Sequence, residues 1–327
     1  MIVWVASRPE QQALEVPDGV TVEFIPREPL SHPRISEVEV LVPPYGSRAV
    51  LDALSEMPAL RLIQTLESGV DWLLPSVPPG VVVCNSRGAH DAAVAEWAVG
   101  AILIMQRRFL EHRDAQQRSE WRDVVSTRGW MAPFAGDLEG ASVLIVGYGS
   151  IGKAVEERLR PFEVDVQRVA RHARAGVSDP TELTRLVSRA DIVILLLPLT
   201  SDTAGLFDSE LIGAMKPGAL LVNAGRGRVV DQQALFAGLR EGRLRAALDV
   251  ADPEPLPADD PLWSAPNLLL TPHIAGDTPR RFRRSWLFVG EQIRRMVDGS
   301  PLENVVFDGG QNAERRRRRE AEGGRGG

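Results

Sequence analysis

The sequence of 327 residues contains a single cysteine, Cys84, so a disulfide bond within the chain is excluded. A chain without disulfides is typical of a reducing compartment such as the cytoplasm. Its longest apolar runs, such as residues 192–197, are far too short to cross a bilayer. The apolar residues 1–6 have no basic segment before them and are interpreted as a strand, not as a signal peptide. We therefore expect a cytoplasmic protein with no membrane partner.

Other kinds of chemistry also lack their usual sequence signs. The chain has no histidine, cysteine and carboxylate residues at metal-ligand spacing, and no G-x-S-x-G motif of the kind that indicates a hydrolase. Its net charge of -6 argues against a nucleic-acid partner. The strongly basic residues 315–319 lie within residues 311–327, which have no apolar pattern. We interpret that segment as a disordered tail, with a nucleic-acid arm as the minor alternative.

Short apolar, β-branched segments alternate with amphipathic segments along most of the chain. Strands are predicted in two sets, residues 2–5, 20–25, 38–42, 60–65 and 81–84, and then residues 142–146, 164–169, 192–197, 219–223, 245–250 and 268–271. Helices are predicted over residues 47–56, 151–159, 182–188, 208–215 and 232–240. Strands that alternate with helices form parallel sheets covered on both faces. We therefore predict an α/β protein with two doubly wound parallel-sheet domains.

Two longer helices are predicted to connect these domains. One covers residues 92–118. The other begins after Asp277-Thr278, where a capping residue precedes a proline suited to the first helical turn, and ends at residues 298–301. The apolar residues of this second helix share one face: Phe282, Trp286, Val289, Ile293 and Val297. If the helix returns to the first domain, that domain is discontinuous (residues 1–97 and 275–310) and residues 98–274 form the second.

A glycine-rich turn follows the first strand of the second set. The residues Gly147-Tyr148-Gly149-Ser150-Ile151-Gly152 have the spacing G-x-G-x-x-G between a predicted strand and a predicted helix. The first glycine permits the turn, the second lets the backbone approach a pyrophosphate, and the third allows close packing of helix on strand. The helix N-terminus adds N–H groups and a positive dipole. The segment is predicted to bind a dinucleotide in a Rossmann domain.

The end of the next strand indicates which dinucleotide is preferred. An NAD site usually has an acidic residue there for the ribose hydroxyls, but residues 169–174 contain none, and Ala170 stands in its place. A carboxylate would repel a 2′-phosphate, whereas Arg171, supported by Arg174, could pair with it. We predict NADP as the preferred cofactor. NAD stays open, since both arginines could also be ordinary solvated residues.

Three polar residues follow later strands of the second set. Arg226 comes after residues 219–223, Glu254 after residues 245–250, and His273 after residues 268–271. Because the carboxyl ends of parallel strands share one edge of the sheet with the glycine turn, these side chains can converge on one cleft. Taken singly, each could be a surface arginine, a loop acid or a structural histidine. Their common position predicts a site.

Several motifs together resemble the D-isomer-specific 2-hydroxyacid dehydrogenase family, which includes glyoxylate/hydroxypyruvate reductases. They are Ser68-Gly69-Val70-Asp71, Asn85 to Glu96 with Gly88, Pro198-Leu199-Thr200 with Thr203, Asn223-Ala224-Gly225-Arg226-Gly227, Glu254-Pro255-Leu256-Pro257 and Thr271-Pro272-His273. The resemblance covers nearly the whole chain. It implies hydride transfer between NAD(P)H and a small 2-oxo acid to give a D-2-hydroxy acid. It also implies a flavodoxin-like substrate domain and a homodimer that uses parts of residues 101–134. Trp121 and Trp130 are candidates for burial in that interface or for capping the partner's cleft, and an ordinary core role is equally open.

The resemblance further implies roles for individual residues. Arg226 would hold the substrate carboxylate and polarise the 2-oxo group, and His273 would protonate the carbonyl oxygen. Glu254 would orient His273 and favour its charged form, and Asp249 would lie near the nicotinamide carboxamide. The other expected contacts are Ser68 and Gly69 to the substrate, and Pro198, Thr203 and Ala224 to the cofactor.

Two rival functions remain open on the same fold. Formate-type relatives replace the glutamate by glutamine, so Glu254 argues against formate, whereas phosphite-type relatives retain the glutamate. A nucleotide-sensing corepressor-like binding protein is the other alternative. Two departures from the family pattern are Gly225, where many relatives have alanine or serine, and Ala251, where many have phenylalanine. Tyr45 follows a strand of the first domain and either lines the substrate site or only packs.

Overall fold

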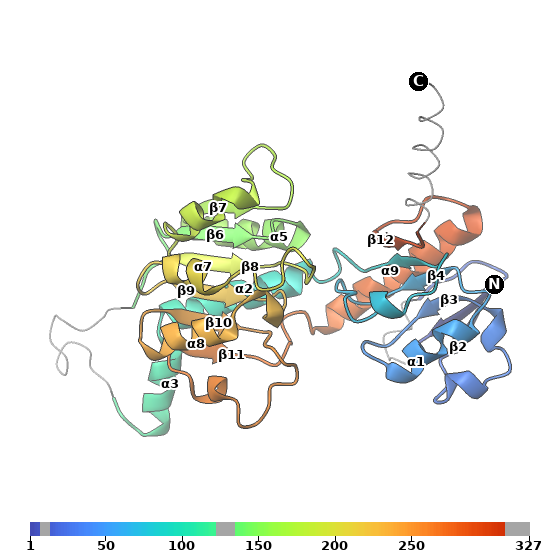
Figure 1. Ribbon diagram of the computed structural model, residues 1–327, viewed down its shortest axis with the longest axis horizontal. Coiled ribbons are helices and arrows are strands. Elements are labelled where there is room, and N and C mark those ends of the chain that lie inside the picture. Colours follow the sequence, from blue (N-terminus) through green and yellow to red (C-terminus); the bar gives the residue numbers. More distant parts are fainter. Residues whose placement is uncertain (7–13, 122–134, 311–327) are drawn as a thin grey trace. The chain divides into compact units, whose positions relative to one another are not determined.

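The computed structural model describes residues 1–6, 14–121 and 135–310, and divides into two compact units (Figure 1). Unit 1 contains Met1–His90 and the chain from Thr278 onward, and unit 2 is Asp91–Asp277. The expected boundaries at residues 97/98 and 274/275 differ from these, because the helix beginning at Asp91 belongs wholly to unit 2. The predicted tail, residues 311–327, lies outside the described residues.

Unit 1 is built on a six-stranded sheet with the order β12-β5-β4-β3-β1-β2. The five expected strands are parallel: β1 (Ile2–Val5), β2 (Thr21–Phe24), β3 (Val38–Val42), β4 (Leu62–Gln64) and β5 (Val82–Cys84). The sixth, β12 (Val305–Asp308), pairs antiparallel with β5 and was not predicted. Val305 and Val306 are both exposed on this edge strand, so it lacks the buried apolar pattern from which the others were read.

Helices cover both faces of this sheet. On one face, α1 (Arg48–Ala53) and the short 3-10 helix Leu54–Glu56 replace the single predicted helix 47–56. The other face is covered by α9 (Pro279–Asp298), whose buried Trp286, Val289 and Ile293 pack on β1, β3, β4 and β5. Thr278 caps α9 at its start, and Gly299, with a φ of 67°, ends it. Val297, expected on the buried face, is 47% exposed.

Unit 2 is built on a six-stranded, fully parallel sheet with the order β11-β10-β9-β8-β6-β7. Its strands are β6 (Ser142–Val146), β7 (Asp165–Val169), β8 (Ile192–Leu195), β9 (Leu220–Asn223), β10 (Arg245–Leu248) and β11 (Leu268–Leu270). All lie within two residues of the predicted bounds. Successive residues of each strand face opposite sides, so two separate cores form.

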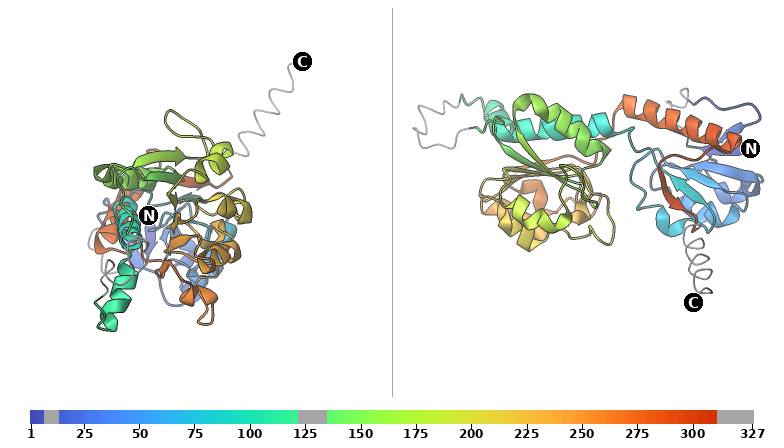
Figure 2. Two further views of the ribbon diagram at one scale, coloured as in Figure 1. Left: turned by 90° about the vertical axis from the view of Figure 1, so that its left-hand side faces the viewer. Right: turned by 90° about the horizontal axis from the view of Figure 1, so that it is seen from above.

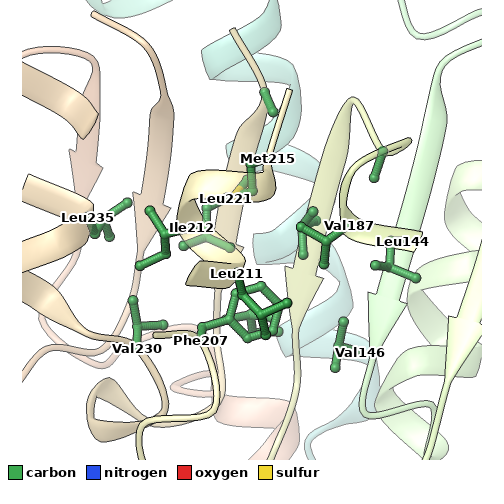
Figure 3. Packing of buried hydrophobic residues seen from close by; sticks show 14 of the residues in the cluster. Leu144, Val146, Val187, Phe207, Leu211, Ile212, Met215, Leu221, Val230 and Leu235 are labelled. Atoms are coloured by element: carbon green, nitrogen blue, oxygen red, sulfur yellow. The ribbon is translucent and has the colours of Figure 1, made fainter. Parts of the chain in front are cut away.

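The two cores of unit 2 are closed by different helices (Figure 2). One face packs against α2 (Asp91–Gln106) and α5 (Ser150–Leu159). The other packs against α6 (Leu183–Val187), α7 (Ser209–Ala214) and α8 (Gln232–Arg240). In Figure 3, Leu211 and Phe207 from the α7 region lie against Val146 and Leu221 of the sheet. The predicted α/β class with two doubly wound domains is confirmed, apart from the antiparallel β12.

The predicted helix 92–118 is two helices. After α2 the chain turns at Arg108, which has a φ of 55°, and continues as α3 (Phe109–Gln117). Trp121 is 94% exposed within this chain, which excludes the ordinary core role and leaves the interface and cleft-capping roles as predictions. Trp130 and much of the expected dimer segment lie outside the described residues. Among the described helices, none combines the length and apolar character needed to cross a membrane.

Candidate active site

The glycine-rich turn joins the carboxyl end of β6 to α5. Gly147 has a φ of 97°, and a Cβ there would lie 2.7 Å from the backbone oxygen of Leu196. The position is therefore restricted to glycine by both conformation and space. Gly149 is different, because no atom of the protein lies within 4 Å of the position its Cβ would occupy. The open space at the second glycine is where a pyrophosphate is expected to approach the backbone.

The third glycine and the start of α5 complete this cradle. A Cβ on Gly152 would lie 3.1 Å from Cδ2 of Tyr148 and 3.3 Å from Cγ2 of Ile145, so its absence lets α5 pack closely on β6. No side chain caps α5, and the Ser150 hydroxyl donates to Asp91 Oδ1 at 3.1 Å. The first-turn N–H groups and the helix dipole therefore suit an anion. The geometry fits the pyrophosphate of a dinucleotide.

Two arginines of the β7 segment support this turn from the side. Arg168 and Arg174 lie over the Tyr148 ring, 5.6 and 5.7 Å from its centroid. Arg174 donates to the Tyr148 carbonyl oxygen at 2.7 Å, and Arg168 pairs with Glu156, which also accepts the Tyr148 hydroxyl. Burial and then the hydrogen bond to Glu156 raise the pKa of Tyr148, so its hydroxyl stays protonated and keeps donating. Through its hydrogen bond to the Tyr148 oxygen, Arg174 holds the glycine turn in place.

Arg171 is placed differently from Arg174. It follows the end of β7, its side chain is 76% exposed, and it donates to Oδ2 of Asp202 at 2.8 Å. Asp202 lies in the loop after β8. The same loop contains Pro198 and Thr203, which are expected to contact the cofactor. Thr203 Oγ1 donates to the Pro198 oxygen at 2.6 Å, which closes this loop into a compact turn.

The segment after β9 is held by a buried asparagine. Asn223 is 1% exposed; its Oδ1 accepts from Gly225 N at 3.0 Å and its Nδ2 donates to Arg226 O at 3.1 Å. These two bonds fix the turn that carries the half-buried Arg226. A Cβ on Gly225 would lie 2.6 Å from the backbone oxygen of Leu197, and one on Gly227 would lie 1.9 Å from that of Ala251. The alanine or serine common in relatives is therefore not accommodated at position 225 with this backbone.

Ala224, another expected cofactor contact, lies in the same turn. Its backbone N–H donates to the oxygen of Leu195 at 3.2 Å, which ties the turn after β9 to the end of β8. The expected cofactor contacts of the β6, β8 and β9 loops are thus neighbours at the carboxyl edge of one sheet.

His273 and Glu254 form a direct pair. Nδ1 of His273 lies 2.8 Å from Oε2 of Glu254, and the other carboxylate oxygen accepts from Ala251 N at 3.1 Å. Burial alone would raise the pKa of Glu254, but the hydrogen bond and charge of His273, the bond from Ala251 and the charge of Arg226 hold it below its ordinary value. A carboxylate that stays ionised beside the imidazole fixes the orientation of the ring.

The backbone of His273 is also unusual. Its φ is 55°, a left-handed conformation that few residues other than glycine and asparagine adopt easily. Its N–H donates to the oxygen of Asp249 at 2.7 Å. The Asp249 carboxylate, 2% exposed, accepts from Thr271 Oγ1, Ile274 N and Ala275 N at 2.6, 2.9 and 2.8 Å. Burial raises the pKa of Asp249 despite these bonds.

Ser68 and Gly69 belong to unit 1. Asn85 Nδ2 donates to the Ser68 oxygen at 2.6 Å, and the Ser68 hydroxyl lies 3.3 Å from Nδ1 of His90. Nε2 of His90 lies 3.0 Å from Nη1 of Arg281, which can only donate, so His90 carries its proton on Nδ1 and donates to Ser68. Two buried side chains therefore brace this loop; Asn85 begins one of the motifs quoted above, and His90 had no predicted role.

Tyr45 also lies in unit 1. Its ring meets Trp72 edge to face at a centroid distance of 5.3 Å, and 47% of the residue is exposed. Tyr45 therefore packs on an aromatic neighbour and also offers an exposed surface.

Within unit 2 the predicted residues gather at one edge. Arg226, Glu254 and His273 follow β9, β10 and β11, and the charges of Arg226 and His273 both act on Glu254. Sequence reasoning missed Asn223 as a support for Arg226, although a polar residue at the end of a buried strand is a readable signal. It also missed Asp202, whose neighbour is distant in the sequence. No set of possible metal ligands occurs among the described residues.

Comparison with known proteins identifies the family. Residues 99–275 match the family described as D-isomer specific 2-hydroxyacid dehydrogenase, NAD binding domain. D-3-phosphoglycerate dehydrogenase of Methanocaldococcus jannaschii is 31% identical over 304 residues, which cover 90% of this chain and 55% of that protein. Formate dehydrogenase (chloroplastic/mitochondrial) of Arabidopsis thaliana is 30% identical over 294 residues, 85% of this chain and 75% of that protein.

A solved structure agrees with these matches. The NADPH-dependent glyoxylate/hydroxypyruvate reductase of Sinorhizobium meliloti, in complex with NADP and sulfate, has a TM-score of 0.80 at 26% identity. The alignment covers 93% of this chain and 97% of that structure. The chain therefore belongs to the D-isomer-specific 2-hydroxyacid dehydrogenase family, as the motifs indicated. It is accordingly an NAD(P)-dependent oxidoreductase.

Proposed function

We propose that this enzyme reduces a small 2-oxo acid to a D-2-hydroxy acid, with NADPH as the preferred hydride donor. The observation that carries the proposal is the pair formed by His273 and Glu254, 2.8 Å apart, with Arg226 close enough to influence the same carboxylate. An acid–base histidine beside a cation suits a carbonyl that gains a hydride and a proton.

Each residue of the group has a distinct task in this reaction. The nicotinamide, when bound, supplies the hydride. Arg226 binds the substrate carboxylate through its planar guanidinium and withdraws electron density from the 2-oxo group. Because Nδ1 of His273 is engaged by Glu254, Nε2 is the ring nitrogen that gives a proton to the carbonyl oxygen. A well-placed general acid contributes about 10²- to 10⁴-fold to such a step.

The substrate loop and the domain roles extend the proposal. Ser68 and Gly69 offer backbone N–H groups to the substrate carboxylate, so the domain expected over residues 1–97 and 275–310, of which unit 1 forms most, is the substrate-binding domain. Residues 98–274 form the dinucleotide-binding domain. Asp249, Pro198, Thr203 and Ala224 contact the nicotinamide half of the cofactor. The proposal also includes a homodimer, which the resemblance implies, and a cytoplasmic location, which the single cysteine favours.

The preference for NADPH rests on the charge at the end of β7. Ala170 replaces the acid of an NAD site, and the exposed Arg171 offers a planar cation that can bind a 2′-phosphate bidentately. The NADP-bound relative from S. meliloti supports a cofactor of this kind. NADH remains the second donor, since no charge at the end of β7 repels it.

The test is oxidation of NADPH and of NADH, followed separately by absorbance, with glyoxylate, hydroxypyruvate and bulkier 2-oxo acids. Arg226→Ala and His273→Asn should each lose nearly all activity. Asparagine is chosen at position 273 because it tolerates the left-handed backbone there. Arg240→Ala, on the exposed surface of α8, is the matched control for the arginine variant and should behave as the parent. Turnover that survives in both site variants would refute the assigned roles.

Formate oxidation is the rival that a relative supports. Formate carries no oxygen that must be protonated as its hydride leaves, so the His273–Glu254 acid–base pair has less to do in that reaction. The assay therefore includes formate and phosphite with NAD⁺ and NADP⁺. Oxidation of either, without reduction of any 2-oxo acid, would replace the proposal. Cofactor binding without any turnover would favour a nucleotide-sensing binding protein.

A further inference from the structure

The ion pair between Arg171 and Asp202 spans the strand that carries the glycine turn. In the sheet of unit 2, β6 lies between β7 and β8. Arg171 extends from the end of β7 and Asp202 from the loop after β8, and they meet at 2.8 Å. The two side chains thus join the loops on either side of the Gly147 turn, at the carboxyl edge where the cradle for the dinucleotide lies.

This pair is not a structural requirement of the fold. Both side chains are largely exposed, 76% and 63%, and an exposed ion pair contributes little to stability. Other arginines of the β7 segment are engaged within the protein, Arg168 by Glu156 and Arg174 by the Tyr148 oxygen. Arg171 instead pairs with the exposed Asp202, and breaking this pair costs little free energy. The guanidinium is therefore available to bind a ligand and is not needed for packing.

Asp202 also brings a carboxylate to the end of β7, where residues 169–174 contain no acidic residue. The end of β7 has Ala170 where an NAD site usually has an acid, which is the basis of the predicted NADP preference. The structure brings a carboxylate to the same neighbourhood from a different loop. A carboxylate there accepts hydrogen bonds from ribose hydroxyls and repels a 2′-phosphate, which carries nearly two negative charges near pH 7.

We propose that Asp202 is a cofactor-specificity residue that opposes Arg171. It competes with the 2′-phosphate of NADP for the guanidinium, and it accepts hydrogen bonds from the adenosine ribose hydroxyls of NAD. With both residues present, the ratio of NADP affinity to NAD affinity is smaller than Arg171 alone would give. The proposal rests on the proposed use of Arg171 at the adenosine ribose.

The test measures binding of NADP⁺ and NAD⁺ by titration calorimetry, without substrate. Asp202→Asn should tighten NADP⁺ about fivefold near physiological salt, because a screened unit charge and a phosphate a few ångströms apart repel to about that extent. It should weaken NAD⁺ about three- to tenfold through loss of a charge-assisted hydrogen bond. Arg171→Ala should weaken NADP⁺ at least about tenfold and change NAD⁺ little.

A matched control and a double variant sharpen the result. Glu182→Gln removes one acid from another exposed ion pair of unit 2, that with Arg185, and should change neither affinity. In Arg171→Ala/Asp202→Asn the gain for NADP⁺ should shrink, since the competition for the guanidinium is gone. The gain in Asp202→Asn should also shrink in high salt.

Two results would overturn the proposal. An unchanged ratio of NADP⁺ to NAD⁺ affinity in Asp202→Asn would remove Asp202 from cofactor selection. Weaker binding of NADP⁺ in Asp202→Asn would mean that the residue supports the cofactor loop and does not oppose the 2′-phosphate. The calorimetry measures binding without turnover, so it can be interpreted even if the 2-oxo acid assay fails. Likewise, an unchanged affinity ratio would not contradict the proposed reaction.

Discussion

Replacing Gly149 by alanine separates cofactor binding from folding. Apart from its chain neighbours, no protein atom lies within 4 Å of the added Cβ, but the backbone (φ -97°, ψ -149°) lies just outside the β region that alanine prefers. This conformation and the poorer N-cap destabilise the variant by about 1–2 kcal/mol, and lower entropy of the unfolded chain offsets about 0.4–1 kcal/mol of this cost. Its free energy of unfolding should therefore stay within about 1 kcal/mol of the parent value, as measured in urea.

Cofactor binding should respond very differently. The methyl group would occupy the space into which the pyrophosphate must come, and overpacking of a close contact costs about 1–3 kcal/mol. That cost corresponds to a loss of NADP⁺ affinity of about 5- to 150-fold, measured by calorimetry. Gly213→Ala, on α7 and also without a clash, is the control that should bind as the parent does.

Gly147→Ala gives the opposite pattern and completes the comparison. Its φ of 97° costs alanine about 1–2 kcal/mol. The 2.7 Å approach to the Leu196 oxygen adds an overpacking cost of about 1–3 kcal/mol, because both groups are backbone. This variant should lose stability by about 2–5 kcal/mol. If Gly149→Ala binds NADP⁺ as tightly as the parent, or unfolds as easily as Gly147→Ala, the assignment of the second glycine to the pyrophosphate is wrong.

Two further predictions concern the groups that hold the site together. Since its pKa is lowered in the folded state, Glu254 stabilises the protein above its ordinary pKa of about 4.3, and this contribution disappears as the pH falls. Glu254→Gln should therefore show a flatter decline of melting temperature between about pH 5 and pH 3; parallel curves for the two proteins would contradict this. Asn223→Ala leaves the buried Gly225 N–H without its acceptor, while the Arg226 oxygen keeps the bond from Val229 N, and the variant should lose about 1–3 kcal/mol in urea unfolding; a loss below about 0.5 kcal/mol would count against this.

The main features of unit 2 could be predicted because they depend on local patterns. Alternating strands and helices predict a parallel sheet, and a parallel sheet gathers its carboxyl ends at one edge. The glycine turn, Arg226, Glu254 and His273 follow from that rule alone. The family resemblance added Ser68 and Gly69, which no periodicity would have indicated.

The features that were missed depend on contacts between distant segments. No glycine or proline marks the break between α2 and α3, where Arg108 adopts a left-handed conformation. β12 forms because β5 offers a free edge, and its own residues are largely exposed. The pair of Arg171 and Asp202 joins two loops that only the strand order β8-β6-β7 brings together. Patterns within one element carry no information about such neighbours.

The contacts of Asp249 add a structural role to the cofactor contact that the sequence predicted for it. A carboxylate has about four acceptor sites. Two are filled at Oδ1 by Thr271 and Ile274, and one at Oδ2 by Ala275, which leaves about one for the expected nicotinamide carboxamide. The backbone oxygen of Asp249 also holds the N–H of His273 in its left-handed turn. A side-chain variant of Asp249 would therefore disturb the position of His273 together with the expected cofactor contact, because the carboxylate holds Thr271, Ile274 and Ala275 on either side of that histidine.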